Sequence, residues 1–125
     1  MRELPSNTPD VVLAAIKGIQ EVKGKDITCL DLRKIHNRVT DFFIICHGDS
    51  STQVNAIADS VEEFTWKLAK EDARHKEGRN NAEWVLLDYF DVVVHIFHRD
   101  KREHFNLEYL WADAPVYEIE ETEAI

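Results

Sequence analysis

The stretch Gly48-Asp49-Ser50-Ser51 follows an apolar run and precedes a helical pattern, an arrangement that could carry chemistry. A glycine turn at a helix N-terminus can hold a phosphate through its backbone N–H groups. Nucleotidyltransferases combine such a turn with carboxylates on a following strand, and those carboxylates hold Mg²⁺. The stretch is therefore a candidate for phosphate or nucleotide chemistry, provided that acidic residues complete it.

The acidic residues are in the wrong places for that site. Asp59, Glu62 and Glu63 fall on a predicted helix and not on a strand that faces the turn. Asp88 and Asp91 flank a predicted hairpin turn and do not form an Asp-x-Asp pair. The chain also lacks the P-loop, G-x-S-x-G and G-x-G-x-x-G patterns. The sequence therefore argues against a nucleotidyltransferase-type enzyme, which we keep only as the weakest alternative.

The remaining reactive side chains favour no metal or redox site. His95 and His98 are three residues apart on a predicted strand, so their side chains point to opposite faces. Cys29 and Cys46 lie in apolar runs without Cys-x-x-Cys spacing, which is typical of reduced core residues. Ser50 begins the Ser-x-x-Gln pattern of a capping box, so helix capping explains it. We predict no catalytic residue, no metal and no cofactor.

Hydrophobic spacing predicts the elements that position these residues. Three helices are expected, over 9–23, 51–70 and 100–111. Five strands are expected, over 26–32, 41–47, 73–77, 84–89 and 92–98. Thr8 should cap the first helix, and Asp100 with Glu103 should cap the last. The order predicts a small α/β domain with one mixed β-sheet and flanking helices.

Length and composition indicate one folded domain. The chain has 125 residues, of which 44% are apolar, far from a disordered composition. We expect a domain over residues 1–115 and a loose acidic tail over 116–125. Apolar runs fall short of the ~18 residues of a membrane span, and the first ten residues lack the apolar stretch of a signal peptide. These features predict a cytoplasmic protein without membrane contact.

The hairpin over 84–98 holds the densest apolar run and has two different faces. With a two-residue turn at Phe90-Asp91, one face is purely apolar and comprises Val85, Leu87, Tyr89, Val92, Val94 and Ile96. The other face mixes aromatic and aliphatic side chains with one carboxylate and one imidazole, namely Trp84, Leu86, Asp88, Val93, His95 and Phe97. Such a mixture is typical of protein-binding surfaces. The alternative is that a helix of the same domain covers it.

The net charge of −9 bears on the partner. A free-standing nucleic-acid binder usually carries a basic face, whereas this chain as a whole repels phosphate. A basic protein partner suits it better. The basic stretch 32–38 (LRKIHNR) could touch phosphate locally, although a solvated loop is the favoured interpretation.

Four blocks of the sequence are similar to the ribosomal silencing factors, also called the Iojap or RsfS family. The blocks are KDITCLDLRK (25–34), TDFFIICHGDSSTQVNAIADSVEE (40–63), EWVLLDYFDVVVHIF (83–97) and LEYLWADAP (107–115). They occur in the family order and cover most of residues 25–115. The resemblance implies a fold of nucleotidyltransferase-like topology without the catalytic carboxylates.

The resemblance also implies a function. Members of the family bind ribosomal protein uL14 (L14) on the large (50S) ribosomal subunit and obstruct joining of the small subunit, which represses translation when nutrients are scarce. A role in large-subunit maturation, a minor contact with rRNA and a homodimer of the free protein are further expectations. Without a transit peptide, the chain resembles the bacterial members. The alternative is a general assembly or interaction module whose partner is not the ribosome.

Carried over position by position, the family's uL14-facing surface includes the tryptophan of the hairpin. The corresponding residues here are Trp84, Leu86, Asp88, Tyr89, Asp91, Val93, His95 and Phe97. One departure concerns Phe90, because the family usually has glycine at this turn. Phenylalanine disfavours a positive φ, so the turn type is open. Phe90 could add a contact to the partner or pack locally.

Overall fold

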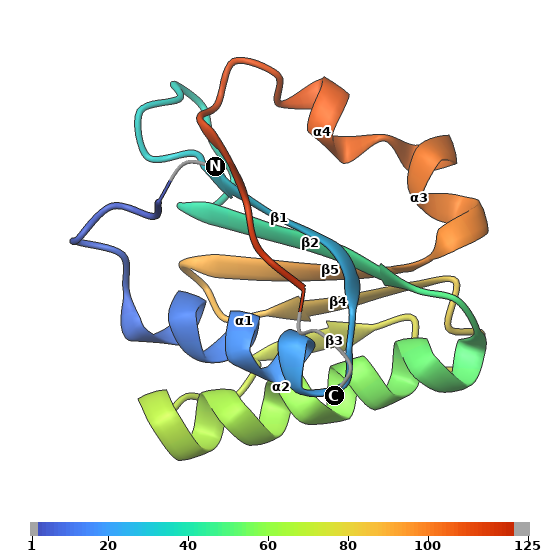
Figure 1. Ribbon diagram of the computed structural model, residues 1–125. Coiled ribbons are helices and arrows are strands. Elements are labelled where there is room, and N and C mark those ends of the chain that lie inside the picture. Colours follow the sequence, from blue (N-terminus) through green and yellow to red (C-terminus); the bar gives the residue numbers. More distant parts are fainter. Residues whose placement is uncertain (1–2, 122–125) are drawn as a thin grey trace.

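The computed structural model describes residues 3–121, which form a six-stranded β-sheet with helices on both faces (Figure 1). The helices are α1 (Asp10–Glu21), α2 (Ser51–Ala69), α3 (Arg99–Phe105) and α4 (Leu107–Leu110). The strands are β1 (Lys25–Asp31), β2 (Phe42–Gly48), β3 (His75–Glu77), β4 (Trp84–Asp88), β5 (Val92–His98) and β6 (Val116–Glu118). Their order in the sheet is β3-β4-β5-β2-β1-β6, and β2 and β5 are parallel. The predicted mixed α/β fold is confirmed.

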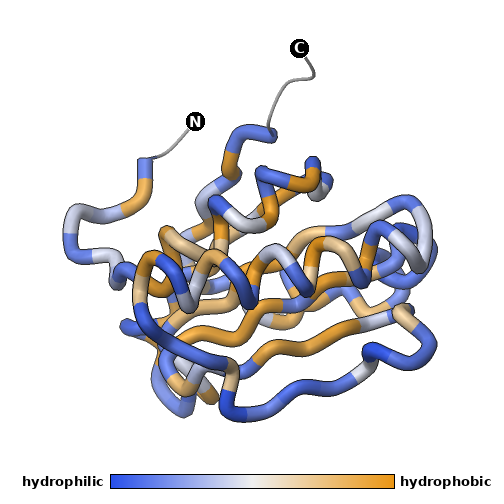
Figure 2. The backbone as a smooth tube through the Cα atoms, turned by 90° about the horizontal axis from the view of Figure 1, so that it is seen from below, coloured by the Kyte–Doolittle hydropathy of each residue, from blue (hydrophilic) through white to orange (hydrophobic). Residues whose placement is uncertain are grey.

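Helices α1 and α2 pack on one face of the sheet and enclose the larger core (Figure 1). Apolar residues follow the inner strands, whereas several of the connecting loops are hydrophilic (Figure 2). The two helices lie close together where Ser60 Oγ donates a hydrogen bond of 2.7 Å to the carbonyl of Gly18. A Cβ atom at Gly18 would lie 2.8 Å from the Ser60 carbonyl oxygen, so a residue without a side chain is required at this crossing.

Helices α3 and α4 lie on the opposite face, above a smaller core (Figure 1). This core gathers apolar side chains of β1, of the residue that follows it, of β2 and of β5, with two residues from the segment that covers them: Leu30, Leu32, Phe43, Ile45, Phe97, Leu107 and Ala114. Strand β2 is therefore buried on both faces, as its run of apolar residues predicts. Within the described residues no helix is long and apolar enough to cross a membrane.

Three helix ends differ from the prediction. The last helix does not continue to residue 111, because Asn106 adopts a left-handed conformation (φ 45°) and separates α3 from α4. The ring of His98, not Asp100, caps α3 by accepting a hydrogen bond from the Asp100 N–H. Thr8 does not cap α1 either, since its hydroxyl donates to the carbonyl of Pro5 at 2.6 Å.

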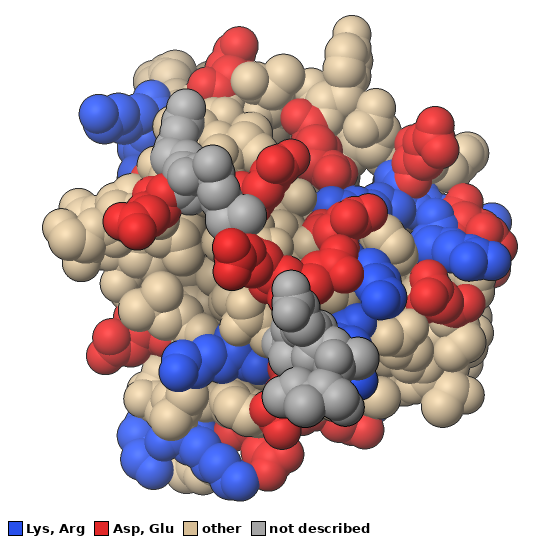
Figure 3. Space-filling model, viewed as in Figure 1, with Lys and Arg blue, Asp and Glu red and all other residues tan. Residues whose placement is uncertain are grey.

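The predicted loose tail is wrong for residues 116–118, which form strand β6. This strand pairs antiparallel with β1 and places Tyr117 opposite Cys29. Tyr117 is buried, so the segment contributes to the larger core. Its one acidic residue, Glu118, stays at the surface and lines a hollow beside β1 with Asp26 and Glu108. Acidic side chains gather near the centre of the face drawn in Figure 3.

Candidate protein-binding surface

The hairpin formed by β4 and β5 has the predicted register. Trp84 lies opposite Phe97, Leu86 opposite His95, and Asp88 opposite Val93. The purely apolar face is buried in the larger core beneath α1 and α2. The register and the composition of both faces are therefore confirmed.

The second face is only partly covered by α3 and α4. His95 and Phe97 are buried beneath them and leave almost no accessible surface. The outer residues of the same face stay half-buried: Trp84, Leu86, Asp88 and Val93. The alternative that helices of the same domain cover this face therefore holds for its centre, whereas its β4 side is left open. Protein binding by that open side stays a prediction.

Trp84 is the centre of an aromatic stack that the fold assembles from three elements. Its ring centroid lies 5.1 Å from that of Phe97 on β5 and 4.5 Å from that of Phe105 on α3. Phe105 is 38% exposed. Sequence reasoning missed Phe105, because nothing in the spacing of residues near the end of this short helix links it to Trp84. Only the tertiary structure brings the two rings together. We call Trp84, Leu86 and Phe105 the aromatic surface.

His95 fixes the orientation of the Trp84 indole. The indole Nε1–H donates a hydrogen bond of 3.0 Å to His95 Nδ1, so the neutral imidazole carries its proton on Nε2. Burial lowers the pKa of His95 to about 3. The Nε2 atom has no hydrogen-bond partner within the described residues, and the Phe43 ring stands nearly perpendicular to the imidazole at 4.6 Å. Trp84 is therefore held by a hydrogen bond as well as by stacking.

A hollow of about 390 Å³ borders the aromatic surface. Glu77, Asn81 and Glu83 line it together with the three residues of the aromatic surface. Gly78 shapes its rim with φ +88°, and a Cβ atom there would lie 1.9 Å from the Trp84 carbonyl oxygen. Carboxylates form ion pairs with a cationic side chain, and aromatic faces attract one as well. The hollow therefore suits a Lys or Arg side chain of a partner.

The other carried-over residues do not all lie on this surface. Tyr89 lies on the opposite face, where it is buried and its hydroxyl lies 2.9 Å from Thr65 Oγ1. Burial raises the pKa of Tyr89 to about 12. Asp88 is half-buried, and its Oδ1 accepts a hydrogen bond from the Phe90 N–H at 2.8 Å. Asp91 is exposed at the hairpin turn. The structure thus groups Trp84 with His95 and Phe97 and separates Tyr89 from them.

Phe90 adopts the positive φ that its side chain disfavours. Its φ is 78°, and the Asp91 N–H donates a hydrogen bond of 3.0 Å to the Tyr89 carbonyl. This i to i+2 bond closes a γ-turn, which is strained at positive φ. Thr40 Oγ1 donates to the Phe90 carbonyl at 2.9 Å, and the Arg74 guanidinium lies 4.5 Å from the ring centroid. These contacts hold a side chain that is 63% exposed.

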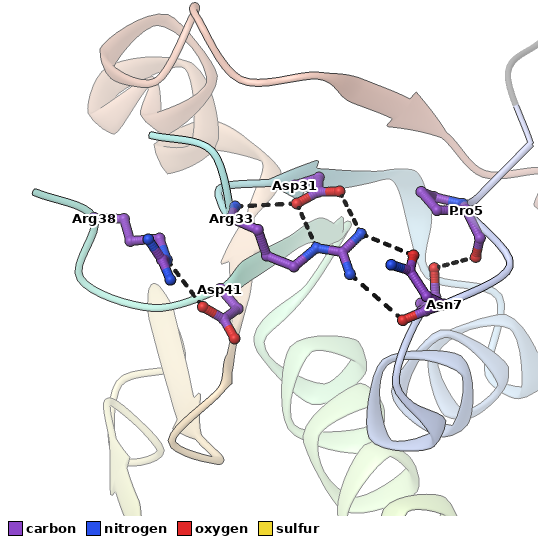
Figure 4. A network of polar contacts seen from close by, with 7 residues as sticks. Pro5, Asn7, Asp31, Arg33, Arg38 and Asp41 are labelled. Carbon is purple, nitrogen blue, oxygen red and sulfur yellow. Dashed lines mark hydrogen bonds and ion pairs between the residues drawn. The ribbon is translucent and has the colours of Figure 1, made fainter. Parts of the chain in front are cut away.

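Ion pairs neutralise much of the basic stretch. Arg33 forms a bidentate pair with Asp31, at 3.0 and 2.8 Å, and reaches Asn7 in the N-terminal segment (Figure 4). Arg38 pairs with Asp41 at 3.0 Å. The hydrogen bond from Arg33 lowers the pKa of Asp31. This loop therefore anchors the N-terminal segment through Arg33, and two of its three cationic residues, Arg33 and Arg38, are each paired with a carboxylate.

The glycine turn at 48–51 serves the start of α2. Ser50 Oγ accepts a hydrogen bond from the Gln53 N–H at 3.1 Å, as the capping pattern predicts. The acidic residues of α2 lie elsewhere, since Asp59 pairs with Arg79 at 2.6 Å and Glu62 pairs with the same guanidinium at 3.3 Å. The capping of α2 is therefore sufficient to explain the residue types of this turn.

Comparisons with known proteins agree with the sequence blocks. The sequence model of a family described as ribosomal silencing factor during starvation matches residues 5–125, beyond the boundary predicted at residue 115. A ribosomal silencing factor from Halalkalibacterium halodurans is 40% identical over 114 residues, which span 89% of this chain and 93% of the relative. One from Bacillus subtilis is 39% identical and covers 91% and 95%. A crystal structure from Chromobacterium violaceum has a TM-score of 0.76 at 37% identity, covering 82% of this chain and 83% of that one.

Proposed function

Because this chain belongs to the family of ribosomal silencing factors, we propose that it binds ribosomal protein uL14 on the 50S subunit and sterically blocks joining of the 30S subunit. Binding would repress translation in the cytoplasm. Blocking requires only occupancy of a surface that the other subunit must reach. The chain therefore acts without turnover, as a regulator and not as an enzyme.

The observation that carries the proposal is the aromatic surface. Trp84 is stacked on Phe97, in tilted contact with Phe105 and hydrogen-bonded to His95, so its indole is ordered before any partner arrives. A preorganised aromatic side chain loses little conformational freedom on binding. Tryptophan is also enriched among the few residues that dominate the energy of protein interfaces.

Charge supports a basic ribosomal protein as the partner. The chain carries a net charge of −9, which would steer it toward a positively charged surface. Glu77 and Glu83 bring part of that charge to the hollow beside Trp84. Val93, Asp88 and Asp91 would lie near the rim of the contact, whereas the buried Tyr89, His95 and Phe97 would support it from within.

Sedimentation of the purified chain with separated 50S subunits tests this assignment. Trp84→Ala should weaken binding by roughly 2–4 kcal/mol, the range of an interface hot spot. Trp66→Ala is the matched control, because Trp66 is a half-exposed tryptophan on α2, on the opposite face of the sheet. It should bind 50S as the unaltered chain does.

Equal binding by both variants would remove the aromatic surface from the contact. Failure of the unaltered chain to sediment with 50S would contradict the proposal itself and favour an interaction module with another partner. Crosslinking of the bound chain should identify uL14 among the large-subunit proteins.

A further inference from the structure

Helix α3 has an unusual attachment to the rest of the domain. None of its residues is buried, so no apolar stripe holds it against the sheet. It is only seven residues long and ends at the left-handed Asn106. An isolated helix of this length is not stable in water. Individual side chains must therefore fix its position.

Arg102 makes the densest set of contacts from α3. Its Nη1 donates to the Lys25 carbonyl at 3.4 Å and lies 3.0 Å from His47 Nδ1. Its Nη2 donates to Thr28 Oγ1 at 3.2 Å and to Glu108 Oε2 at 3.0 Å. The side chain is only 11% exposed. One guanidinium thus joins α3 to β1, β2 and α4.

The second attachment is Phe105, which lies one helical turn after Arg102, stacks on Phe97 and contacts Trp84 in a tilted geometry. The two residues reach different parts of the sheet, because Arg102 contacts β1 and β2 while Phe105 contacts β4 and β5. A rigid helix held at Arg102 places Phe105 at a defined point above Trp84. Without that anchor, α3 would rely on its continuity with β5, on the exposed ion pair of Arg99 with Asp49 and on the ring contacts of Phe105.

We infer that Arg102 is a positioning residue for the partner-binding site: its bridge between β1, β2 and α4 docks α3 and thereby completes the aromatic surface with Phe105. The biological meaning of this inference rests on the proposed function. Arg102 itself lies away from the hollow beside Trp84 and acts on the partner only through Phe105.

The indole N–H resonance of Trp84 reports the docking directly by NMR, because its chemical shift senses the ring current of Phe105. Trp84→Phe identifies the resonance among those of Trp66 and Trp111. Arg102→Ala should move it toward its position in Phe105→Ala. Arg99→Ala is the matched control, since Arg99 is an exposed arginine of the same helix, and it should leave the resonance in place.

Thr28→Val provides a second variant in case Arg102→Ala fails to fold. It removes the hydroxyl that accepts a hydrogen bond from Arg102, with little change in side-chain volume. It should move the Trp84 resonance in the same direction as Arg102→Ala, but by a smaller amount. The inference is overturned if neither variant moves the resonance, or if Arg99→Ala moves it equally.

Binding to 50S subunits supplies a double-mutant cycle. Arg102→Ala and Phe105→Ala should each weaken binding about tenfold, and the double variant should also lose about tenfold. A loss near a hundredfold in the double variant would mean that Arg102 acts independently of Phe105, which contradicts the inference. If the unaltered chain does not bind 50S, the proposed function fails, while the Trp84 resonance still decides the role of Arg102.

Discussion

Trp84 is held in one orientation by His95 and Phe97 of β5 and by Phe105 of α3. Alternation along the hairpin placed Trp84, His95 and Phe97 on one face, because the side-chain period of a strand is two. Alternation could not show that His95 accepts the indole N–H, nor that Phe105 reaches the same ring from α3. Those contacts depend on side-chain rotamers and on tertiary packing, and neither produces a periodic pattern in the sequence.

The buried His95 should make stability fall in mild acid. Its pKa is about 3 in the folded chain, below the ordinary value of 6.5 expected in the unfolded chain. The unfolded state therefore binds the proton first, so this contribution is complete above pH 6.5 and is lost as pH falls toward 3. Linkage predicts a loss of about 2 kcal/mol between pH 7 and pH 5, measured by urea unfolding.

His95→Asn tests whether this residue causes the loss. Asparagine keeps an acceptor for the indole but does not titrate, so the difference between pH 7 and pH 5 should shrink. The depressed pKa of the half-buried His47, caused by burial and by Arg102, acts in the same direction and should leave a residual dependence. An unchanged pH dependence in His95→Asn would show that His95 is not the titrating group.

Substitutions of Phe90 should reveal how much its positive φ lowers the free energy of unfolding. Phe90→Ala keeps the positive φ and loses the contact with Arg74, whereas Phe90→Gly loses the contact but removes the strain. We expect the glycine variant to be more stable than the alanine variant by about 1–2 kcal/mol, the usual cost of a left-handed L-residue. Urea unfolding measures the difference. Equal stability of the two variants would contradict a strained turn at residue 90.

The elements that were predictable carry strong local signals. Helix α2 has a capping serine and a long apolar stripe, and the hairpin has strict alternation. The elements that differed from the prediction depend on local conformation or on residues far away in the sequence. Strand β6 has three residues in an acidic segment and exists because β1 offers an unpaired edge. Asn106 ends α3 in a left-handed conformation that helical spacing alone does not reveal.

The crossing of α1 and α2 should tolerate no added atom at Gly18. A Cβ atom there would meet the backbone of Ser60 and Val61, each at 2.8 Å, so the helices must separate. Gly18→Ala should lower the free energy of unfolding by about 1–3 kcal/mol, as overpacking does elsewhere. Leu13→Ala on the exposed side of α1 is the control and should cost less. A neutral Gly18→Ala would show that the two helices can separate without loss.

At the scale of the whole molecule, the two faces of the sheet differ in how they are covered. Helices α1 and α2 bury one face fully, whereas the smaller α3 and α4 leave the β4 side of the other face open. That open side carries the aromatic surface and the acidic hollow. This asymmetry leaves on one face the surface on which the proposed basic partner would dock.

If the proposed function is correct, a 50S subunit occupied by this chain cannot join a 30S subunit. The test adds the chain to 50S subunits before 30S subunits and follows 70S formation by sucrose-gradient sedimentation. We expect that the 70S peak falls, that the chain migrates with 50S, and that Trp84→Ala restores the peak while Trp66→Ala does not. Normal 70S formation with the chain bound to 50S would contradict steric blocking.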